Sequence, residues 1–191
     1  MNRAADVVVA GVGLALTSPL LGLAALATKL ESGGPVLYRQ TRVGRQGKDF
    51  EVLKLRSMVV GAEKVGAGYA VDQGDRRITR VGRILRRTSI DELPQLWNIL
   101  RGDMSVIGPR PTLRYQVEQY DEQQWRRLEI RPGLTGWAQV QGRASLPWAD
   151  RIELDVWYVD HRSPRVDLEI LLKTPLALFR GTYRGATGGW R

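Results

Sequence analysis

The chain has 191 residues, and its 29 lysines and arginines outnumber its 20 acidic residues, which gives a formal net charge of +9. It contains no cysteine, so a disulfide framework, a thiolate metal site and a thiol nucleophile are all excluded. The positive charge indicates an anionic partner, which composition leaves open between nucleic acid, anionic lipid head groups and a phosphorylated substrate.

Near its start the chain has an uncharged, apolar run over residues 7–28, which Ser18 and Pro19 interrupt at the centre. An unbroken helix of this length would rise about 33 Å, enough to cross a hydrocarbon core of about 30 Å. Because Pro19 cannot donate a backbone hydrogen bond, we expect a kink there, with the Ser18 or Thr17 hydroxyl bonding a freed carbonyl. The pattern therefore predicts a kinked re-entrant helix over residues 1–30, which enters and leaves the same membrane leaflet.

Two other interpretations of this run stay open. A basic start and small residues near Ala27 imitate a cleavable signal peptide, and a plain transmembrane helix can tolerate a proline. Basic residues lie on both sides of the run, however, and the positive-inside tendency then favours both ends on the cytoplasmic side. We therefore expect residues 31–191 to form one cytoplasmic domain.

The residues after the apolar run predict a small, compact α/β domain. Residues 36–43 and 50–56 alternate apolar with polar side chains around a turn at residues 44–49, which is typical of a β-hairpin. Residues 61–75 are rich in glycine and charge and predict a loop beside the binding site. The amphipathic segment 166–179 would pack on the core or lie in a membrane interface. Further helices are expected at about residues 89–100, 113–130 and 149–158.

Several familiar nucleophile and nucleotide motifs are missing. The single histidine, His161, lies in a polar turn, and we expect it at the surface rather than in a catalytic pair. No Walker A loop is present, and the Gly11-Val12-Gly13 stretch lacks the third glycine and the preceding strand of a dinucleotide site. Carboxylates, arginines and a hard metal ion remain as the sources of chemistry.

The strongest candidate site is the Asp91-Glu92 pair. In a structural interpretation, Ser89 is a helix N-cap and Glu92 completes a capping box, which the spacing supports equally well. In a functional interpretation, the same helix start binds phosphate through free N–H groups, with Arg86 and Arg87 just upstream. Because adjacent helical residues point about 100° apart, the two carboxylates would have different tasks, such as nucleophilic attack and metal binding.

Two further stretches carry arginines in stiff or turn-rich loops. Pro109 and Pro111 flank Arg110 and fix the direction of its guanidinium, which suits bidentate phosphate recognition, although an ordinary turn between helices would look similar. Residues 131–143 combine turn glycines with an amphipathic tryptophan and end in Arg143. Arginine-bearing loops and a carboxylate pair in a basic domain indicate an anionic substrate, and the membrane segment indicates that part of it is a lipid.

Together these motifs resemble the bacterial sugar transferase family, the monotopic polyprenyl-phosphate phosphoglycosyl transferases. The resemblance covers about residues 3–178 and rests on Ser18-Pro19, residues 54–58 (KLRSM), Asp91-Glu92, residues 102–105 (GDMS), 108–111 (GPRP) and 131–140 (RPGLTGWAQV). It implies an enzyme of the bacterial inner membrane, with its catalytic domain on the cytoplasmic face. Such an enzyme transfers a phospho-sugar from a nucleotide diphosphate sugar, usually a UDP-sugar, to polyprenyl (undecaprenyl) phosphate and releases the nucleoside monophosphate. This step opens the assembly of capsule, exopolysaccharide, O-antigen or glycoprotein glycans, and the chain resembles the family's minimal form.

The resemblance also implies roles for individual residues. Asp91 is the expected nucleophile, which takes the phospho-sugar as a covalent acyl phosphate. Glu92 is expected to help hold Mg²⁺ (or Mn²⁺), with Asp91 as the other candidate ligand. The expected phosphate or nucleotide contacts are Arg86, Arg110 and Arg143, with Lys54 and Arg56 as weaker candidates.

The expected partners are the nucleotide-sugar donor, polyprenyl phosphate and membrane lipids, without nucleic acid. The oligomeric state stays open, a homodimer included, and sugar specificity is expected in loops such as residues 61–75 and 181–191. The alternative function is a basic membrane-associated module that binds phospholipid or nucleic acid without catalysis, in which Asp91 and Glu92 only cap a helix.

Overall fold

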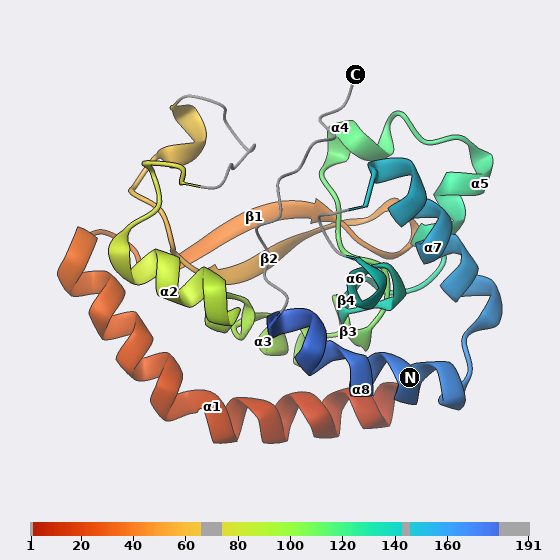
Figure 1. Ribbon diagram of the computed structural model, residues 1–191, viewed down its shortest axis with the longest axis horizontal. Coiled ribbons are helices and arrows are strands. Elements are labelled where there is room, and N and C mark those ends of the chain that lie inside the picture. Colours follow the sequence, from red (N-terminus) through yellow and green to blue (C-terminus); the bar gives the residue numbers. More distant parts are fainter. Residues whose placement is uncertain (1, 66–73, 143–145, 180–191) are drawn as a thin grey trace.

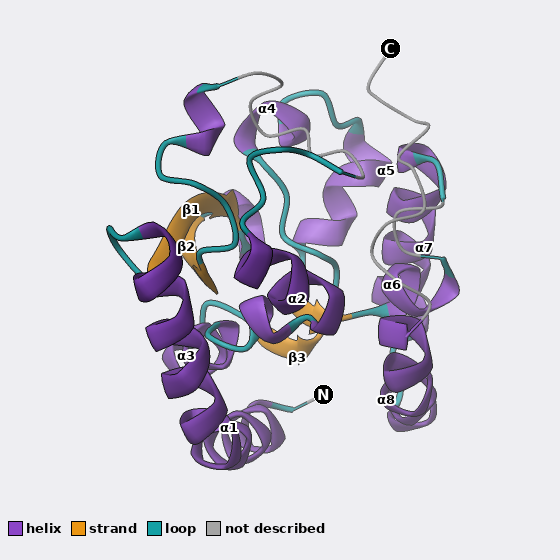
Figure 2. Cartoon of the chain, turned by 60° about the vertical axis from the view of Figure 1, so that its left-hand side comes forward, coloured by secondary structure: helices purple, strands orange, loops and turns teal. Residues whose placement is uncertain are grey.

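The computed structural model describes residues 2–65, 74–142 and 146–179, which form a mixed α/β fold of helices and two small sheets, as the sequence predicts. Its helices are α1 (Arg3–Ser32), α2 (Arg80–Thr88), α3 (Gln95–Arg101), α4 (Arg114–Val117), α5 (Glu122–Trp125), α6 (Trp137–Gln141), α7 (Trp148–His161) and α8 (Pro164–Phe179). Its strands are β1 (Leu37–Val43), β2 (Asp49–Leu55), β3 (Ser105–Ile107) and β4 (Gly133–Thr135). Figure 1 shows α1 and α8 along the lower edge of the molecule, with α4 and α5 above, and in Figure 2 α1 rises on the left while α8 lies at the lower right.

Helix α1 is one continuous helix that bends near its middle (Figure 1). Pro19 lies inside it, and the hydroxyls of Thr17 and Ser18 donate to carbonyls of the preceding turn at 2.7 and 2.9 Å. The expected bend and hydroxyl bonds are therefore present. The chain does not divide into two separate helices at this point.

Most of the apolar surface of α1 faces away from the rest of the protein. Leu16 and Leu30 are 76% and 77% exposed, whereas Asp6, Ala10 and Ala24 are buried against the domain. Within the described residues, α1 is the one helix that is long and apolar enough to cross a membrane. An exposed apolar helix of this length is consistent with membrane association.

Strands β1 and β2 form the antiparallel hairpin that the sequence predicts, with Leu37 opposite Leu55 and Val43 opposite Asp49. Strands β3 and β4 pair in parallel, so that two segments far apart in the chain meet at the centre of the domain. The sequence pattern does not predict this second pair, because strands of three residues are too short to show alternation.

The helix predicted over residues 89–100 is wrong at its start. Ser89 adopts a left-handed backbone conformation with φ of 57°, which ends α2. A short 3-10 turn over Ile90–Glu92 follows, and α3 begins only after Pro94. The Asp91-Glu92 pair therefore lies on a tight turn between two helices.

The other predicted helices are confirmed in part. Helices α7 and α8 match the predictions for residues 149–158 and 166–179. The helix predicted over residues 113–130 is broken into α4 and α5, because Asp121 caps a new helix instead of continuing the first. In the predicted loop over 61–75, residues 66–73 lie outside the described part of the chain.

The apolar core joins α1 to the elements around the centre of the domain. Its largest cluster draws on α1, α3, β3, α7 and α8 and consists of Ala10, Leu96, Ile99, Met104, Val106, Ile107, Tyr158 and Ile170. The buried Asn98 fixes α3 to β2, because its side chain accepts from the Leu53 N–H at 3.0 Å and donates to the Glu51 carbonyl at 2.7 Å. The long N-terminal helix thus shares one core with the elements that follow it.

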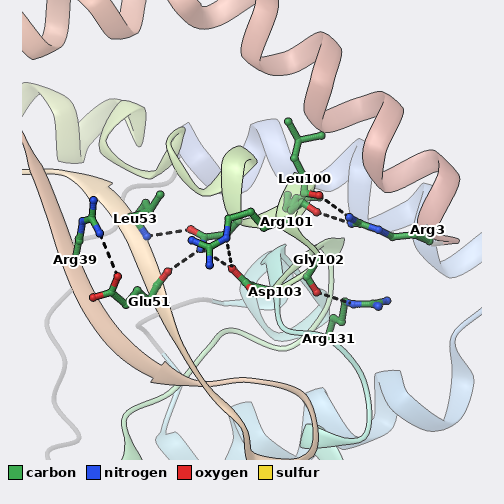
Figure 3. Close-up of polar contacts among 11 residues, drawn as sticks. Arg3, Arg39, Glu51, Leu53, Leu100, Arg101, Gly102, Asp103 and Arg131 are labelled. Atoms are coloured by element: carbon green, nitrogen blue, oxygen red, sulfur yellow. Dashed lines mark hydrogen bonds and ion pairs between the residues drawn. The ribbon is translucent and has the colours of Figure 1, made fainter.

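Polar contacts also hold α1 against this core. The Arg3 guanidinium donates to two carbonyls in the last turns of α3 at 2.5 and 2.7 Å, where the helix has unpaired acceptors (Figure 3). The buried Asp6 carboxylate accepts bonds from the Ser105 hydroxyl and the Val106 N–H of β3, both at 2.9 Å. The first turns of α1 are therefore bonded to α3 and β3.

Candidate active site

A cavity of about 830 Å³ opens beside the hairpin and brings together segments from most of the chain. Strands β1 and β2, the end of α2, the Asp91 turn, the loop after β3, and helices α6 and α7 all contribute to its lining. Several basic side chains are among the lining residues, and a cavity of this size is typical of a small-molecule site. The basic lining residues are Arg39, Arg42, Lys54, Arg56, Arg86, Arg110, Arg127 and Arg151.

Asp91 lies in the wall of this cavity with 8% of its surface exposed. Burial, with a smaller contribution from the neighbouring Glu92 charge, raises the pKa of Asp91 to about 6. The carboxylate is therefore ionised at neutral pH yet more basic than an ordinary aspartate. Its charge lies in a largely buried position close to Lys54, Arg86 and Arg110.

Within the described residues, Glu92, unlike Asp91, is hydrogen-bonded directly to two basic side chains, Lys54 and Arg110. Its Oε1 atom accepts from Lys54 Nζ at 2.9 Å and from Arg110 Nη2 at 2.6 Å. Burial raises the pKa of Glu92, but Arg110 and Lys54 outweigh it and hold the value well below its usual range. The two adjacent carboxylates thus differ in protonation behaviour and in partners, as their different directions led us to expect.

The capping-box interpretation of this pair is wrong. Ser89 makes no side-chain capping bond, and its left-handed backbone closes α2 instead of opening a helix. Glu92 bonds Lys54 and Arg110 rather than the backbone of Ser89. A non-glycine residue held at positive φ two residues before a buried carboxylate is the kind of local strain that gathers at functional sites.

Arg110 reaches Glu92 from the loop that follows β3. The parallel pairing of β3 with β4 and a 2.8 Å bond from the Gly133 N–H to the Pro109 carbonyl fix the start of this loop. A Cβ at Gly108 would lie 2.4 Å from the Arg131 carbonyl oxygen, so only glycine fits this approach. The prolines on either side of Arg110 therefore belong to a loop whose backbone is held from several directions.

A buried ion pair between Arg127 and Asp155 also holds the loop that carries Arg110. Arg127 donates to the Asp155 carboxylate, with side chains 3% and 4% exposed, and also to the Arg110 carbonyl at 3.0 Å. The Arg127 guanidinium also lies 5.7 Å from the ring centres of Tyr120 and Trp148. This pair connects α7 to the Arg110 loop, and the sequence gives no local signal for it because its partners lie far apart in the chain.

The structure brings most of the predicted site residues together. Arg86 and Lys54 line the cavity, and the charge of each lowers the pKa of Asp91. Arg56 also lines it, but it is buried and donates to the Gly33 carbonyl at the end of α1. Arg143 lies outside the described residues.

Arg42 is a cavity residue that sequence reasoning missed. Tyr38, Gln40 and Arg42 lie at every second position of β1, so their side chains share one strand face, and all three line the cavity. Burial and the nearby Arg110 charge lower the pKa of Arg42 to about 10, which leaves it protonated at neutral pH. The sequence carries no distinct signal for Arg42, because Arg39 and Thr41 are polar as well. Its charge adds to a cavity that attracts anions.

The carboxylates suit a magnesium ion that arrives with a phosphate ligand. Among the described residues, no group of three or more His, Cys, Asp or Glu side chains is placed to hold a metal. Mg²⁺ usually needs only one or two carboxylates when substrate phosphates and water complete its shell. Both hydrogen bonds of Glu92 use Oε1, so its Oε2 and the Asp91 carboxylate are the oxygens that fit such an ion.

His161 lies at the surface, as the sequence predicts. It is exposed at the end of α7, and its ring stacks on Trp157 with centres 4.5 Å apart. The ring does not line the cavity, so the chemistry of the site falls to Asp91, Glu92 and the surrounding cations.

Residues 1–181 match the family model described as bacterial sugar transferase. A UDP-glucose:undecaprenyl-phosphate glucose-1-phosphate transferase of Caulobacter vibrioides is 49% identical over 181 residues, covering 91% of this chain and 67% of the relative. The exopolysaccharide production protein ExoY of Rhizobium meliloti is 41% identical and covers 95% of this chain and 88% of the relative.

A longer relative is the UDP-N-acetylgalactosamine-undecaprenyl-phosphate N-acetylgalactosaminephosphotransferase of Aeromonas hydrophila. It is 42% identical over 188 residues, and the match covers 95% of this chain but 44% of the relative, so the chain spans less than half of that protein. The family match runs through the whole described cavity, and these relatives share two fifths or more of their aligned residues with it. The chain belongs to the bacterial sugar transferase family.

Proposed function

We propose that this protein transfers a sugar-1-phosphate from a UDP-sugar to undecaprenyl phosphate and so begins the assembly of an exopolysaccharide or related glycan. One observation carries the proposal: a buried carboxylate, Asp91, lies in the wall of a cation-lined cavity beside a second carboxylate locked to Lys54 and Arg110. The names of relatives at 42% and 49% identity supply the donor and acceptor classes.

The reaction proceeds in two displacements at phosphorus. An Asp91 oxygen attacks the phosphorus that bears the sugar, and the bond from that phosphorus to the bridging oxygen breaks, so that UMP leaves with the electron pair. The sugar phosphate is then bonded to Asp91 as an acyl phosphate. A phosphate oxygen of undecaprenyl phosphate attacks the same phosphorus, the bond to Asp91 breaks, and the carboxylate is restored.

The surrounding charges explain why a carboxylate can approach a phosphate here. Two anions repel unless cations neutralise the phosphoryl oxygens, and fixed cations do so without reorganising in the transition state. Arg110 is positioned by Glu92 and by the support from Arg127, while Arg42 lies beside it. Arg86 adds positive charge close to Asp91.

Asp91 and Glu92 are the residues that would hold Mg²⁺ together with the phosphates of the donor. A bound divalent ion would neutralise the diphosphate and improve UMP as a leaving group. The Lys54 and Arg110 bonds keep Glu92 ionised at neutral pH, which keeps it competent as a ligand for a hard cation.

The N-terminal helix would place this chemistry at the membrane. We expect the bent α1 to enter and leave the cytoplasmic leaflet of the inner membrane, since both of its arms pack on the same domain through Ala10 and Ala24. Helix α8 also has exposed leucines and would lie in the interface. The acceptor phosphate could then reach the cavity while its chain stays in the lipid.

The alternative is a basic membrane-bound module that binds phosphate groups without chemistry. This alternative explains the net positive charge of the chain and the apolar helix α1. It does not explain why the pKa of Asp91 is raised or why Ser89 adopts a strained backbone conformation. The test is to mix enzyme, UDP-sugar and Mg²⁺ without acceptor. One equivalent of UMP and a phospho-sugar adduct on Asp91, found by mass spectrometry, are expected.

The matched control is Asp150→Asn, which removes an exposed carboxylate of α7 and should form the adduct normally. Chelator should suppress both UMP release and the adduct. Substantial sugar-phosphate transfer by a folded Asp91→Asn protein would sink the covalent mechanism.

A further inference from the structure

A second cavity, of about 290 Å³, lies at the base of the N-terminal arm of α1. It shares no described lining residue with the larger cavity, so it is separate from the proposed active site. Its lining includes three arginines from distant parts of the chain, Arg45, Arg131 and Arg162, together with Asp6. Arg45 lies in the hairpin turn, Arg131 in the loop before β4, and Arg162 at the end of α7.

Two of these arginines are held in place through one nitrogen each. Arg45 Nε donates to the Glu129 carbonyl at 3.1 Å, and Arg131 Nε donates to the Gly102 carbonyl at 2.9 Å. Figure 3 shows the Arg131 guanidinium extending past Gly102. The terminal nitrogens of both residues make no hydrogen bond to any described residue. The Nε bonds therefore fix the orientation of each guanidinium group, and its two terminal nitrogens can still donate to a ligand.

Within the described residues, neither acidic side chain of this cavity forms an ion pair with the three arginines. Asp6 accepts from the Ser105 hydroxyl and the Val106 N–H, and Glu129 pairs with Arg126 at 3.4 Å. Arg162 makes no ion pair or side-chain hydrogen bond within the described part of the chain. Three guanidinium groups that line one small cavity without a carboxylate partner repel one another, and a bound anion would relieve that repulsion.

The place of the cavity indicates where the anion comes from. Asp6 lies in the first turns of α1, and Arg162 lies in the two-residue link between α7 and α8. Figure 1 shows α1 and α8 on the lower side of the molecule, and both carry exposed apolar side chains, such as Leu16 and Leu172. A phosphate bound in this cavity, beside Asp6 of α1 and Arg162 before α8, would belong to a molecule at the membrane surface.

We propose that this arginine-lined cavity binds the phosphate group of an anionic membrane phospholipid and fixes the depth of the N-terminal arm of α1 in the leaflet. The proposal rests on the membrane insertion proposed above. It adds a lipid site that is distinct from the acceptor site, because the two cavities share no described lining residue.

The test uses the full chain in a nonionic detergent, without donor or acceptor. Dihexanoyl phosphatidylglycerol is titrated, and the thermal unfolding midpoint gives the apparent affinity, because a ligand that binds only the folded state raises this midpoint. Dihexanoyl phosphatidylcholine tests for binding driven by acyl chains alone. Inorganic phosphate tests for a site that takes a soluble anion.

We expect a saturable rise with phosphatidylglycerol and none with the other two probes. Arg162→Gln should weaken the affinity about tenfold, the loss expected for one charged hydrogen bond, and Arg45→Gln with Arg162→Gln should abolish the shift. The matched control is Arg83→Gln with Arg165→Gln, which removes two exposed arginines outside the cavity and should bind normally.

Three results would overturn the proposal: an equal shift with phosphatidylcholine, an equal shift with inorganic phosphate, or an equal loss of affinity in the control pair. The unfolding midpoint of each variant without lipid shows whether it is folded. Asp91→Asn should keep the wild-type lipid affinity, so failure of the covalent mechanism and failure of the lipid site are separate results.

Discussion

Asp6 of α1 accepts a 2.9 Å hydrogen bond from the backbone N–H of Val106 in β3, and this bond joins the N-terminal helix to the strand that leads into the Arg110 loop. The same carboxylate oxygen accepts from the Ser105 hydroxyl, and Asp6 is almost fully buried. A buried carboxylate is stable only when such donors satisfy it. The position of α1 against the domain and the position of the Arg110 loop are therefore linked through β3.

The first prediction concerns this link. Asp6→Ala leaves the Ser105 hydroxyl and the Val106 N–H without a partner and should cost about 1–3 kcal/mol of stability, together with part of the transfer activity. Asp6→Asn keeps one carbonyl oxygen as an acceptor and should lose less of both. Thermal unfolding in detergent and UMP release measure the two effects. Equal behaviour of the alanine and asparagine variants would show that the Val106 bond does not matter.

The second prediction concerns Asp91 and stability. Burial raises the folded-state pKa of Asp91 to about 6 from an ordinary value of 3.8, so this group favours folding when protonated. Its stabilising contribution is complete below about pH 4 and is lost as the pH rises through 6. At pH 8, Asp91→Asn should therefore abolish transfer while raising stability by on the order of 2 kcal/mol. A variant that is both inactive and less stable than wild type at pH 8 would contradict this.

The third prediction concerns the pH dependence of the first step. Only the ionised Asp91 attacks phosphorus, so the single-turnover rate of UMP release should fall about tenfold for each pH unit below about 6. Glu92 stays ionised throughout this range because Arg110 and Lys54 hold its pKa low. Rapid-quench measurement between pH 5 and 8 tests it. A rate that stays constant down to pH 5 would exclude Asp91 as the titrating nucleophile.

The fourth prediction concerns the hydrogen bonds from Lys54 and Arg110 to Glu92. Glu92→Gln replaces a charged acceptor with a neutral one, so Lys54 and Arg110 should lose their alignment and kcat should fall about 10- to 100-fold. The same variant should need more Mg²⁺ for half-maximal activity, because an amide is a poorer ligand. Titration of Mg²⁺ against the transfer rate checks both effects.

Arg110→Lys is the complementary variant for this pair. Lysine keeps the charge but lacks the planar fork, so it should not restore wild-type activity. Arg114→Lys makes the same change in a residue that bonds Asp49 and does not line the cavity, and it should retain activity. Full activity of Arg110→Lys would reduce the role of Arg110 to a point charge.

The fifth prediction concerns the path of α1 through the membrane. Pro19→Ala with Ser18→Ala restores the missing backbone donor and should straighten α1 toward a spanning helix, moving residue 2 to the far side. Accessibility of a cysteine placed at position 2 measures this in intact cells. The re-entrant path is wrong if that cysteine is labelled from outside in the otherwise unmodified protein.

The sequence by itself predicted the features that depend on neighbours in the chain. Alternating residues gave the β1–β2 hairpin, apolar periodicity gave α7 and α8, and Pro19 in an apolar run gave a bend in α1. The Asp91-Glu92 pair and Arg110 stood out because their residue types and rigid flanks suit phosphate chemistry. Each of these signals is contained in a stretch of fewer than about 25 residues.

Only the tertiary structure decided how the carboxylate pair is used. Glu92 bonds Lys54 and Arg110, which are 38 and 18 residues away, so its distinction from Asp91 arises from long-range contacts. The left-handed turn at Ser89 overrides a good capping pattern, because the Lys54 and Arg110 bonds engage Glu92 in the folded protein. The Arg127–Asp155 pair and the second arginine-lined cavity likewise depend on segments that meet only after folding, and pairwise sequence spacing contains no information about such distances.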